Sequence, residues 1–499
     1  MLNVKTWKRV HLIGIGGINM SAVAKLLVKA GTKVTGSDVK ASEFTEQLEK
    51  LGVKIAIGPH DERNLPSDCQ GVVHTSAAPD DNPERLAAKN RNLPDITNFE
   101  WLGSWFKGKK VVLVTGTHGK STTTALLGQM CIAGGLDPTV VVGSKMPDWP
   151  DQNLRIGSSD LIIIEGDEYA KHFLEFSPTA LIINNIELDH TDVYKDIDDI
   201  RKTFEKLLHQ TKRNGTVVAN GESEQVRLAL KQFISTKLLK PVFFGNVPRP
   251  ASFVPGSPKI EGDLEATTKI GRNNDMTTVA ITHADWAIDL ATPLMGRHNG
   301  MNVAAAALMA HALGIKDEAI QKIASEFKGI WRRMELLGER DGVKIFSDYG
   351  HHPTAVRANI DALRQAFPDK RLVLCFQPHH KNRTKQLFDD FTTCFDRADV
   401  LVLCEIYDVP GRSADEDADM TSQRLLASVV GRQSSVVSGH SAEDGKQTTD
   451  DRRLVIMEYA PDPAAAVKRT LEILKPGDVC VFMGAGDMDA EVRKVMNTP

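Results

Sequence analysis

The sequence predicts an α/β protein of three domains, each built on a mostly parallel sheet with helices between its strands. Two observations carry this prediction. Short apolar runs recur along the chain with helix-length segments between them, an alternation typical of parallel sheets. The runs also fall into three series, and 499 residues suffice for about three domains of ordinary size.

The first series covers residues 1–107 and predicts a Rossmann-like domain. We expect a strand over 10–15, a helix over 20–30 and further strands over 33–38 and 71–75. The strands end in small or polar residues, and ligands of such sheets bind at the carboxyl ends of strands.

The second series covers residues 108–328 and predicts a P-loop domain. A helix is expected to begin near Lys120, directly after an apolar strand. The stretch 240–292 is polar with short alternating runs, which favours a small β region. The other expected elements are strands over 111–115, 160–165 and 179–184, and an Ala-rich helix over 301–313.

The third series covers residues 329–499 and predicts a second Rossmann-like domain. Ser, Gly, Asp and Thr dominate residues 432–453, which favours an exposed loop. The expected strands occupy 343–347, 371–376, 400–404, 454–458 and 479–483.

Composition excludes several classes of protein. A formal charge of -4 and the lack of a basic block argue against a nucleic-acid partner. The six cysteines form no Cys-x-x-Cys pair, so neither a zinc ribbon nor a redox pair is indicated, and reduced thiols fit the cytoplasm. The first residues read as a strand and turn rather than a signal peptide, and no apolar run is long enough to predict a membrane span.

A phosphate-binding loop stands at the start of the second series. The sequence GTHGKS, with Gly116, Thr117, His118, Gly119, Lys120 and Ser121, follows an apolar strand, and Thr122 continues it. Glycines allow close backbone approach, a lysine supplies a cation, and the helix N-terminus attracts anions. The first glycine of the usual P-loop pattern would fall at Val114, so the loop is a compact variant. The alternative is a Gly-rich turn with a surface lysine.

Two further strand ends in this series offer metal ligands. Glu165 ends an apolar strand in EGDE, and His190 follows another strand in ELDH. With the hydroxyl of Ser121, the carboxylate of Glu165 is a suitable ligand for Mg²⁺. The alternatives are a helix cap for Glu165 and a structural histidine for His190.

The first series carries a weak dinucleotide fingerprint. Gly14, Gly16 and Gly17 precede Asn19, which occupies the last glycine position, and Asp38 follows at the spacing of a ribose-binding acid. The pattern predicts a diphosphate over a helix N-terminus. It leaves open whether that diphosphate belongs to NAD or to another nucleotide.

Two loops of the third series concentrate charge at strand ends. SDYGHHP contains Asp348 and His352, and FQPHHKNRT contains His379 and Arg383. Such loops bind anionic substrates or are only solvated. Metal binding by His351 and His352 is an alternative, but no carboxylate–histidine spacing of a zinc site accompanies them.

These motifs, taken in order, resemble those of the Mur ligases of bacterial cell-wall synthesis. GTHGKS, EGDE, the segment 185–190, GRHN at 296–299, DYGHHP and QPHHKNRT all contribute, and the resemblance covers essentially the whole chain. GIGGINMS, Ser37 with Asp38, and GAGD at 484–487 are similar to those of the alanine-adding members.

The resemblance implies an ATP- and Mg²⁺-dependent ligase that joins L-alanine to UDP-N-acetylmuramate through an acyl phosphate, in peptidoglycan synthesis and hence in cell shape and division. We expect a cytoplasmic protein that is a monomer or a homodimer. His118 would face the muramate and Asn299 the adenine, while Arg332 and Asp348 would meet ATP across the domain gap. Lys120, His190, His352, His379 and Arg383 would act in catalysis; Ser121, Glu165 and His190 would bind metal; and Gly14, Gly16, Gly17, Ser37, Asp38 and Ser76 would bind the UDP part.

Several alternatives stay open at this point. EGDEY is also similar to the ligase that recycles a murein tripeptide, and His380 stands where the alanine-adding members have arginine. The amine could therefore be alanine, glycine, serine or a tripeptide. A non-catalytic sensor of a UDP-sugar is an alternative of another class, and an NAD-dependent oxidoreductase is a third.

Overall fold

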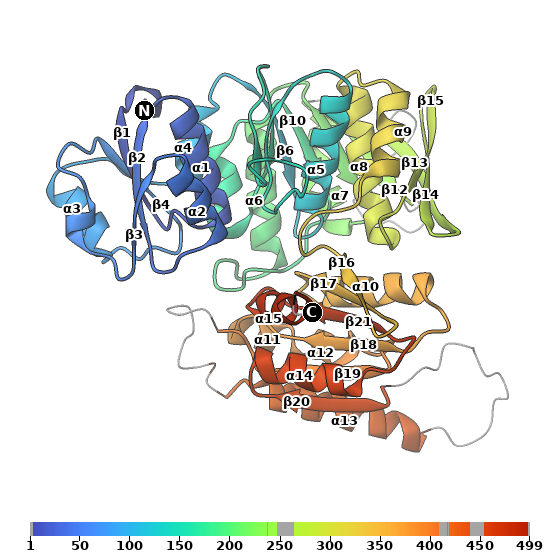
Figure 1. The fold of residues 1–499 in the computed structure, drawn as a ribbon. Coiled ribbons are helices and arrows are strands. Elements are labelled where there is room, and N and C mark those ends of the chain that lie inside the picture. The colour runs from blue at the N-terminus through green and yellow to red at the C-terminus, as the bar shows by residue number, and fades with distance from the viewer. Residues whose placement is uncertain are drawn as a thin grey trace.

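The computed structural model describes residues 3–236, 238–246, 264–408, 417, 419–439 and 454–497. They form three sheets, so the predicted α/β fold is confirmed. The first and central sheets lie side by side across the top of Figure 1, and the C-terminal sheet lies below them. No helix among the described ranges has the length and apolar content needed to cross a membrane.

The first sheet is entirely parallel, with strand order β3-β2-β1-β4-β5. Its central strand β1 is buried on both faces from its second residue to its last, as expected when helices cover both sides. The strands are β1 (Arg9–Ile13), β2 (Lys33–Asp38), β3 (Lys54–Ile57), β4 (Gly71–His74) and β5 (Asp95–Thr97), and the helices are η1 (Val4–Thr6), α1 (Ile18–Lys29), α2 (Glu43–Lys50), η2 (Glu62–Asn64), α3 (Pro83–Asn90) and α4 (Asn98–Trp105).

The central sheet has ten strands in the order β15-β14-β13-β12-β11-β10-β6-β9-β7-β8. Strands β6 to β13 that neighbour one another pair in parallel, apart from the short β7·β8 pair. The strands are β6 (Lys110–Thr115), β7 (Thr139–Val141), β8 (Leu154–Arg155), β9 (Leu161–Glu165), β10 (Ala180–Ile183), β11 (Thr216–Asn220), β12 (Lys240–Gly245), β13 (Glu265–Asn273), β14 (Met276–His283) and β15 (Trp286–Thr292).

One helix of the central domain buries mainly small residues. The Ala-rich helix α8 is buried from Asn299 to Ala310 and packs against α5, because alanine and glycine allow close helix contacts. The expected β region is present, but its strands extend the central sheet rather than forming a separate one. The helices are α5 (Lys120–Ala133), η3 (Tyr169–Glu175), α6 (Ile197–Gln210), α7 (Glu224–Thr236), α8 (Arg297–Ala312) and α9 (Asp317–Glu326).

The C-terminal sheet has the order β16-β17-β21-β18-β19-β20, and only the β16·β17 pair is antiparallel. Its four central strands are buried, apart from one half-buried residue of β17. The strands are β16 (Glu335–Arg340), β17 (Val343–Asp348), β18 (Leu372–Phe376), β19 (Val400–Cys404), β20 (Ile456–Ala460) and β21 (Val479–Met483), and the helices are α10 (Pro353–Ala366), α11 (Lys381–Gln386), α12 (Phe388–Thr393), α13 (Ser422–Gly439), α14 (Pro463–Ile473) and α15 (Met488–Met496).

Two expectations for this region were wrong. Residues 432–439 are helical rather than a loop, because α13 is anchored by buried Leu425 and Val429 and continues through the polar stretch; residues 440–453 lie outside the described part. Strand β20 begins two residues later than expected, and Val455 before it is exposed. All six cysteines are buried and free.

The loop 142–153, between β7 and β8, contacts all three domains. Lys25 of α1 is 4% exposed, and its Nζ donates to the Asp151 carbonyl at 2.7 Å and to Asn153 Oδ1 at 3.1 Å. At the other end, Ser144 Oγ donates to the carbonyl of Trp331, which precedes the C-terminal sheet, at 2.9 Å. The loop therefore ties the outer domains to the central one.

We predict that Lys25 makes the stability of the protein increase with pH above about 8. Burial lowers the pKa of Lys25 from 10.5 to about 8, although Asp151 and Glu43 oppose it. Between these values the unfolded state binds more protons, so stability rises with pH through this range. The Lys25→Met variant lacks this contribution. From about pH 8 to pH 10, the melting temperature of the unsubstituted chain should therefore rise relative to that of the variant by on the order of 2–4 °C.

The control is Lys29→Met, which removes an exposed lysine from the same helix. Its melting temperature should follow that of the unsubstituted chain at every pH. Parallel pH profiles for all three proteins would contradict the assigned shift.

Candidate active site

The loop between β6 and α5 surrounds the amino group of Lys120. Gly116 and Gly119 have φ of 128° and 82°, a region that glycine enters without strain, and a Cβ on Gly119 would collide with Asn302. Lys120 Nζ lies 2.8 Å from the Gly116 carbonyl oxygen and 2.8 Å from Glu168 Oε2. Burial disfavours its charge, but Glu168, Asp167 and Glu165 outweigh this and raise the pKa of Lys120. The loop therefore holds a permanent cation at the N-terminus of α5.

Ser121 and Glu165 lie together, as the sequence predicted. Ser121 Oγ donates to Glu165 Oε1 at 3.1 Å, and the Gly143 amide donates to Glu165 Oε2 at 2.8 Å. Burial raises the pKa of Glu165 despite the nearby Lys120. A second cation beside this carboxylate would stabilise its ionised form. The hydroxyl and the carboxylate therefore have the chemistry of a Mg²⁺ site.

His190 lies with a second set of acids that the sequence argument did not single out. Its Nε2 is 3.4 Å from Glu168 Oε1, and ligand atoms of Asp167, Glu168 and His190 all lie within 4.8 Å of one another. Burial opposes its charge, but Asp189 and Glu168 raise the pKa of His190. The signal for Asp167 and Glu168 was present, because both belong to the EGDE motif at the strand end.

The C-terminal domain meets this group of acids through Arg383 of α11. Arg383 Nε donates to Asp189 Oδ1 at 2.8 Å, and both side chains are buried. Burial opposes ionisation of Asp189, but Arg383 and neighbouring histidines hold the pKa of Asp189 well below its usual range. Arg383 Nη1 also donates to the carbonyl oxygen of His379, whose ring stacks on Tyr407. An ion pair thus joins the central and C-terminal domains.

A cavity of about 400 Å³ brings these residues together. All three domains line it, since Ile18 and Phe99 come from the first and Arg383 from the last. It collects His118, Lys120, Ser121, Glu165, His190, Arg332, His352, His379 and Arg383 of the predicted site, together with Asp167, Glu168, Tyr169, Asp189, Arg333 and His380.

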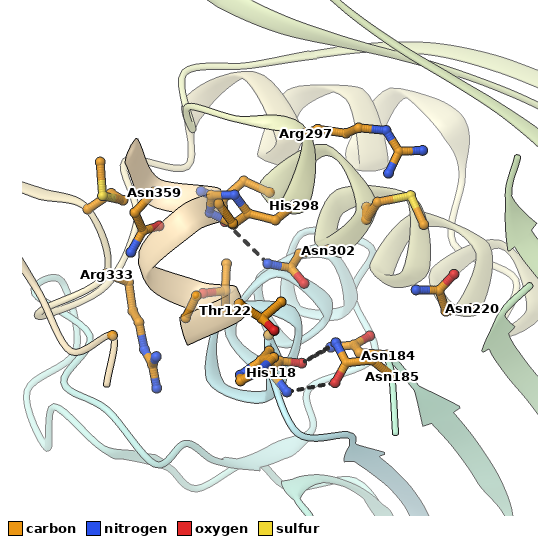
Figure 2. Close-up of a pocket in the computed structure, with 18 of the residues that line it drawn as sticks. His118, Thr122, Asn184, Asn185, Asn220, Arg297, His298, Asn302, Arg333 and Asn359 are labelled. Carbon is orange, nitrogen blue, oxygen red and sulfur yellow. Dashed lines mark hydrogen bonds between the residues drawn. The ribbon is translucent and has the colours of Figure 1, made fainter. Parts of the chain in front are cut away.

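A second cavity, of about 220 Å³, also has His118 in its lining (Figure 2). Thr122, Asn299 and Asp348 of the predicted site line it, and Figure 2 shows Arg333 projecting beside it. Asn299 Nδ2 donates to the Met295 carbonyl oxygen at 2.8 Å, which fixes the amide. The cavity lies between the phosphate loop and the C-terminal domain.

Asp348 and Arg332 are engaged inside the C-terminal domain. Asp348 accepts hydrogen bonds from the amides of Met334 and Gly350 and from Asn359 Nδ2, and burial raises the pKa of Asp348. Arg332 donates to the carbonyl oxygens of Gly484 and Gly486. Its neighbour Arg333 lines both cavities and was missed, because nothing in the sequence distinguishes the two arginines.

The predicted UDP-binding residues lie apart from this centre, at the carboxyl ends of β1, β2 and β4. Asp38 Oδ2 accepts from the Gly16 amide at 2.9 Å and so holds the glycine turn. Ser37 is buried and donates to Glu84 Oε2 at 2.6 Å, so its hydroxyl is used inside the domain. Ser76 Oγ lies 2.7 Å from His172 Nε2 of the central domain. Gly14 and Gly17 form the rest of the turn, with Gly17 N donating to the Gly14 carbonyl oxygen.

Comparison with known families decides the assignment. Models of the Mur ligase family, catalytic domain, of the Mur ligase middle domain and of the Mur ligase, glutamate ligase domain match residues 9–110, 114–310 and 332–486. The chain belongs to the Mur ligase family.

Several relatives of the chain in this family carry the same name. UDP-N-acetylmuramate--L-alanine ligases of Clostridium kluyveri and Clostridium botulinum are 35% and 33% identical to it over 96% of each chain. The crystal structure of UDP-N-acetylmuramate-alanine ligase from Thermotoga maritima superposes with a TM-score of 0.75 at 26% identity, covering 97% of both chains.

We predict that Arg383 stabilises this Mur ligase through Asp189. Arg383→Met leaves a buried carboxylate without its partner, which costs about 3–5 kcal/mol, and the unfolding midpoint should fall. Arg383→Met with Asp189→Asn should recover most of the loss, because no charge then stays unpaired. Calorimetric unfolding of the three proteins measures this.

Arg357→Met is the matched control, because Arg357 is an exposed arginine of the same domain. Its midpoint should hardly change. Equal losses in Arg383→Met and in the double variant would show that the pair itself contributes little.

Proposed function

We propose that the protein joins L-alanine to UDP-N-acetylmuramate at the expense of ATP, forming an amide bond. One observation carries the proposal: residues of three domains meet in one cavity around the ion-paired Lys120, with oxygen ligands on one side and Arg383 with histidines on the other. The names of its relatives support the choice of substrates.

The assignment of substrates to domains follows from the positions of the loops. The first domain would bind the UDP part over the turn formed by Gly14, Gly16 and Gly17, with Asp38 holding it. ATP would place its phosphates over Lys120 and its base in the smaller cavity beside Asn299. The muramate carboxylate would then lie in the larger cavity, and the amine would enter from the side of His379 and Arg383.

The chain's own residues provide the charges that the reaction needs. Attack of the substrate carboxylate on the γ-phosphate brings two anions together, and Lys120 neutralises part of this charge. Glu168 is ion-paired with Lys120 Nζ in this structure, so the phosphates would have to displace Glu168 from the amino group. The carboxylate displaces ADP from the γ-phosphate to give an acyl phosphate, and attack of the alanine amine on its carbonyl carbon then releases phosphate and a proton and forms the amide.

The donor set fits Mg²⁺ bound with the nucleotide. Ser121 and Glu165 offer two oxygen atoms 3.1 Å apart, and Asp167, Glu168 and His190 form a second group. Mg²⁺ prefers oxygen ligands, and it would supply charge neutralisation for the phosphates. Ser121 with Glu165 is the proposed first site and His190 with its acids the second.

The recycling ligase is the nearest alternative, and structures of murein peptide ligases share this fold. A free tripeptide needs more room for the amine than alanine does. The cavity of about 400 Å³ must also hold the muramate carboxylate and phosphates, which favours the smaller amine.

We predict ADP release that depends on L-alanine. Purified protein with ATP, Mg²⁺ and UDP-N-acetylmuramate should release ADP when L-alanine is added, and more slowly with glycine, L-serine or murein tripeptide. His380 faces the amine side of the cavity, so the comparison of alanine, glycine and serine also measures its effect on specificity. Faster ADP release with the tripeptide would favour the recycling reaction. The absence of ADP release with every amine would contradict the proposal.

We also predict that Lys120→Ala abolishes turnover. Loss of a cation that faces developing phosphate charge costs at least ~10²–10³-fold in kcat. Lys195→Ala removes an exposed lysine that lines neither cavity and should keep full activity. Circular dichroism and a melting curve check that Lys120→Ala is folded, and normal activity in that variant would remove Lys120 from the mechanism.

A further inference from the structure

Three side chains converge at the boundary between the two cavities, away from Ser121 and Glu165. His118 Nε2 lies 3.5 Å from Glu187 Oε2, and His352 Nδ1 lies 4.0 Å from the same oxygen. The ligand atoms of all three lie within 4.8 Å of one another. Two imidazoles and one carboxylate therefore face a common point.

Hydrogen bonds to neighbouring residues hold His118 and Glu187 in place. The main chain of His118 is fixed by Asn184 and Asn185, as Figure 2 shows, and its buried Nε2 has no hydrogen-bond partner among the described residues. Glu187 Oε2 accepts a hydrogen bond from Thr354 Oγ1 at 2.8 Å. The three side chains are thus oriented before any ligand arrives.

His352 has the orientation of a metal-binding histidine. Its Nε2 lies 3.3 Å from the Leu188 carbonyl oxygen, which favours a proton on Nε2 and a lone pair on Nδ1. Burial lowers the pKa of His352 to about 4, so the ring is neutral at pH 7. On Nδ1 an ion would replace a long cap bond, 3.3 Å from the Thr354 amide.

We propose that His118, Glu187 and His352 bind a divalent transition cation of the Zn²⁺ class, with water as the fourth ligand. Zn²⁺ holds nitrogen and oxygen ligands at about 2.0–2.1 Å in a tetrahedron, which places ligand atoms about 3.4 Å apart. The two separations of 3.5 and 4.0 Å require only small side-chain movements. Imidazole ligands favour Zn²⁺ over Mg²⁺.

The site links two domains. His118 and Glu187 come from the loops after β6 and β10 of the central domain, whereas His352 precedes α10 of the C-terminal domain. An ion held by all three fixes the C-terminal domain against the phosphate loop. The spacing of the residues in the sequence could not reveal it, because each ligand comes from a different loop.

The test measures binding of Zn²⁺ to the full chain after removal of metal with a chelator. Calorimetric titration with Zn²⁺ in excess Mg²⁺ and without nucleotide should show one site, and Co²⁺ should give the absorption bands of a tetrahedral complex. His352→Asn keeps a helix-capping side chain but removes the imidazole, and Glu187→Gln keeps the size of the side chain. Both variants, and His118→Asn, should bind Zn²⁺ at least tenfold more weakly.

The controls are His351→Asn, next to the site, and His190→Asn, in the other cluster; both should bind Zn²⁺ as the unsubstituted chain does. Wild-type affinity in folded His352→Asn and Glu187→Gln, or loss of binding only in His190→Asn, would overturn the proposal. So would the absence of Zn²⁺ binding once Mg²⁺ is present. Because no nucleotide or ligase substrate is present, none of these results bears on the ligase reaction.

Discussion

Carboxylates crowded together at the ends of parallel strands must be neutralised, and the rest of the site depends on this constraint. Glu165, Glu168 and Asp189 are brought together because β9 and β10 lie on either side of β6 and end at the same edge. Lys120 neutralises one part of this charge and Arg383 another. A deep group of acids without these cations would not stay ionised.

The same constraint couples domain position to ligand binding. Arg383 belongs to the C-terminal domain, so the charge of Asp189 is balanced only while that domain is in place. Lys120 is ion-paired with Glu168 in this structure, and a bound triphosphate would compete with Glu168 for the amino group of Lys120. Nucleotide binding therefore changes the charge that the neighbouring acids present, and cations are the natural means of restoring the balance.

The sequence predicted the parts that depend on local patterns. Apolar runs and glycine turns located most strands, and GTHGKS located Lys120 and Ser121 beside Glu165. Features that depend on three-dimensional placement were missed. Nothing local shows that Arg332 donates to the Gly484 carbonyl oxygen, that Arg333 lines both cavities, or that polar residues after Arg432 continue a helix.

The loop 142–153 limits how far the three domains can be treated as separate modules. Its contacts to Lys25 on one side and Trp331 on the other mean that an excised central domain would expose polar groups that normally face its neighbours. A chimaera that exchanges the first domain between relatives must therefore carry over the loop's partners as well as the sheet. A domain can therefore be exchanged between relatives only together with the residues through which it contacts this loop.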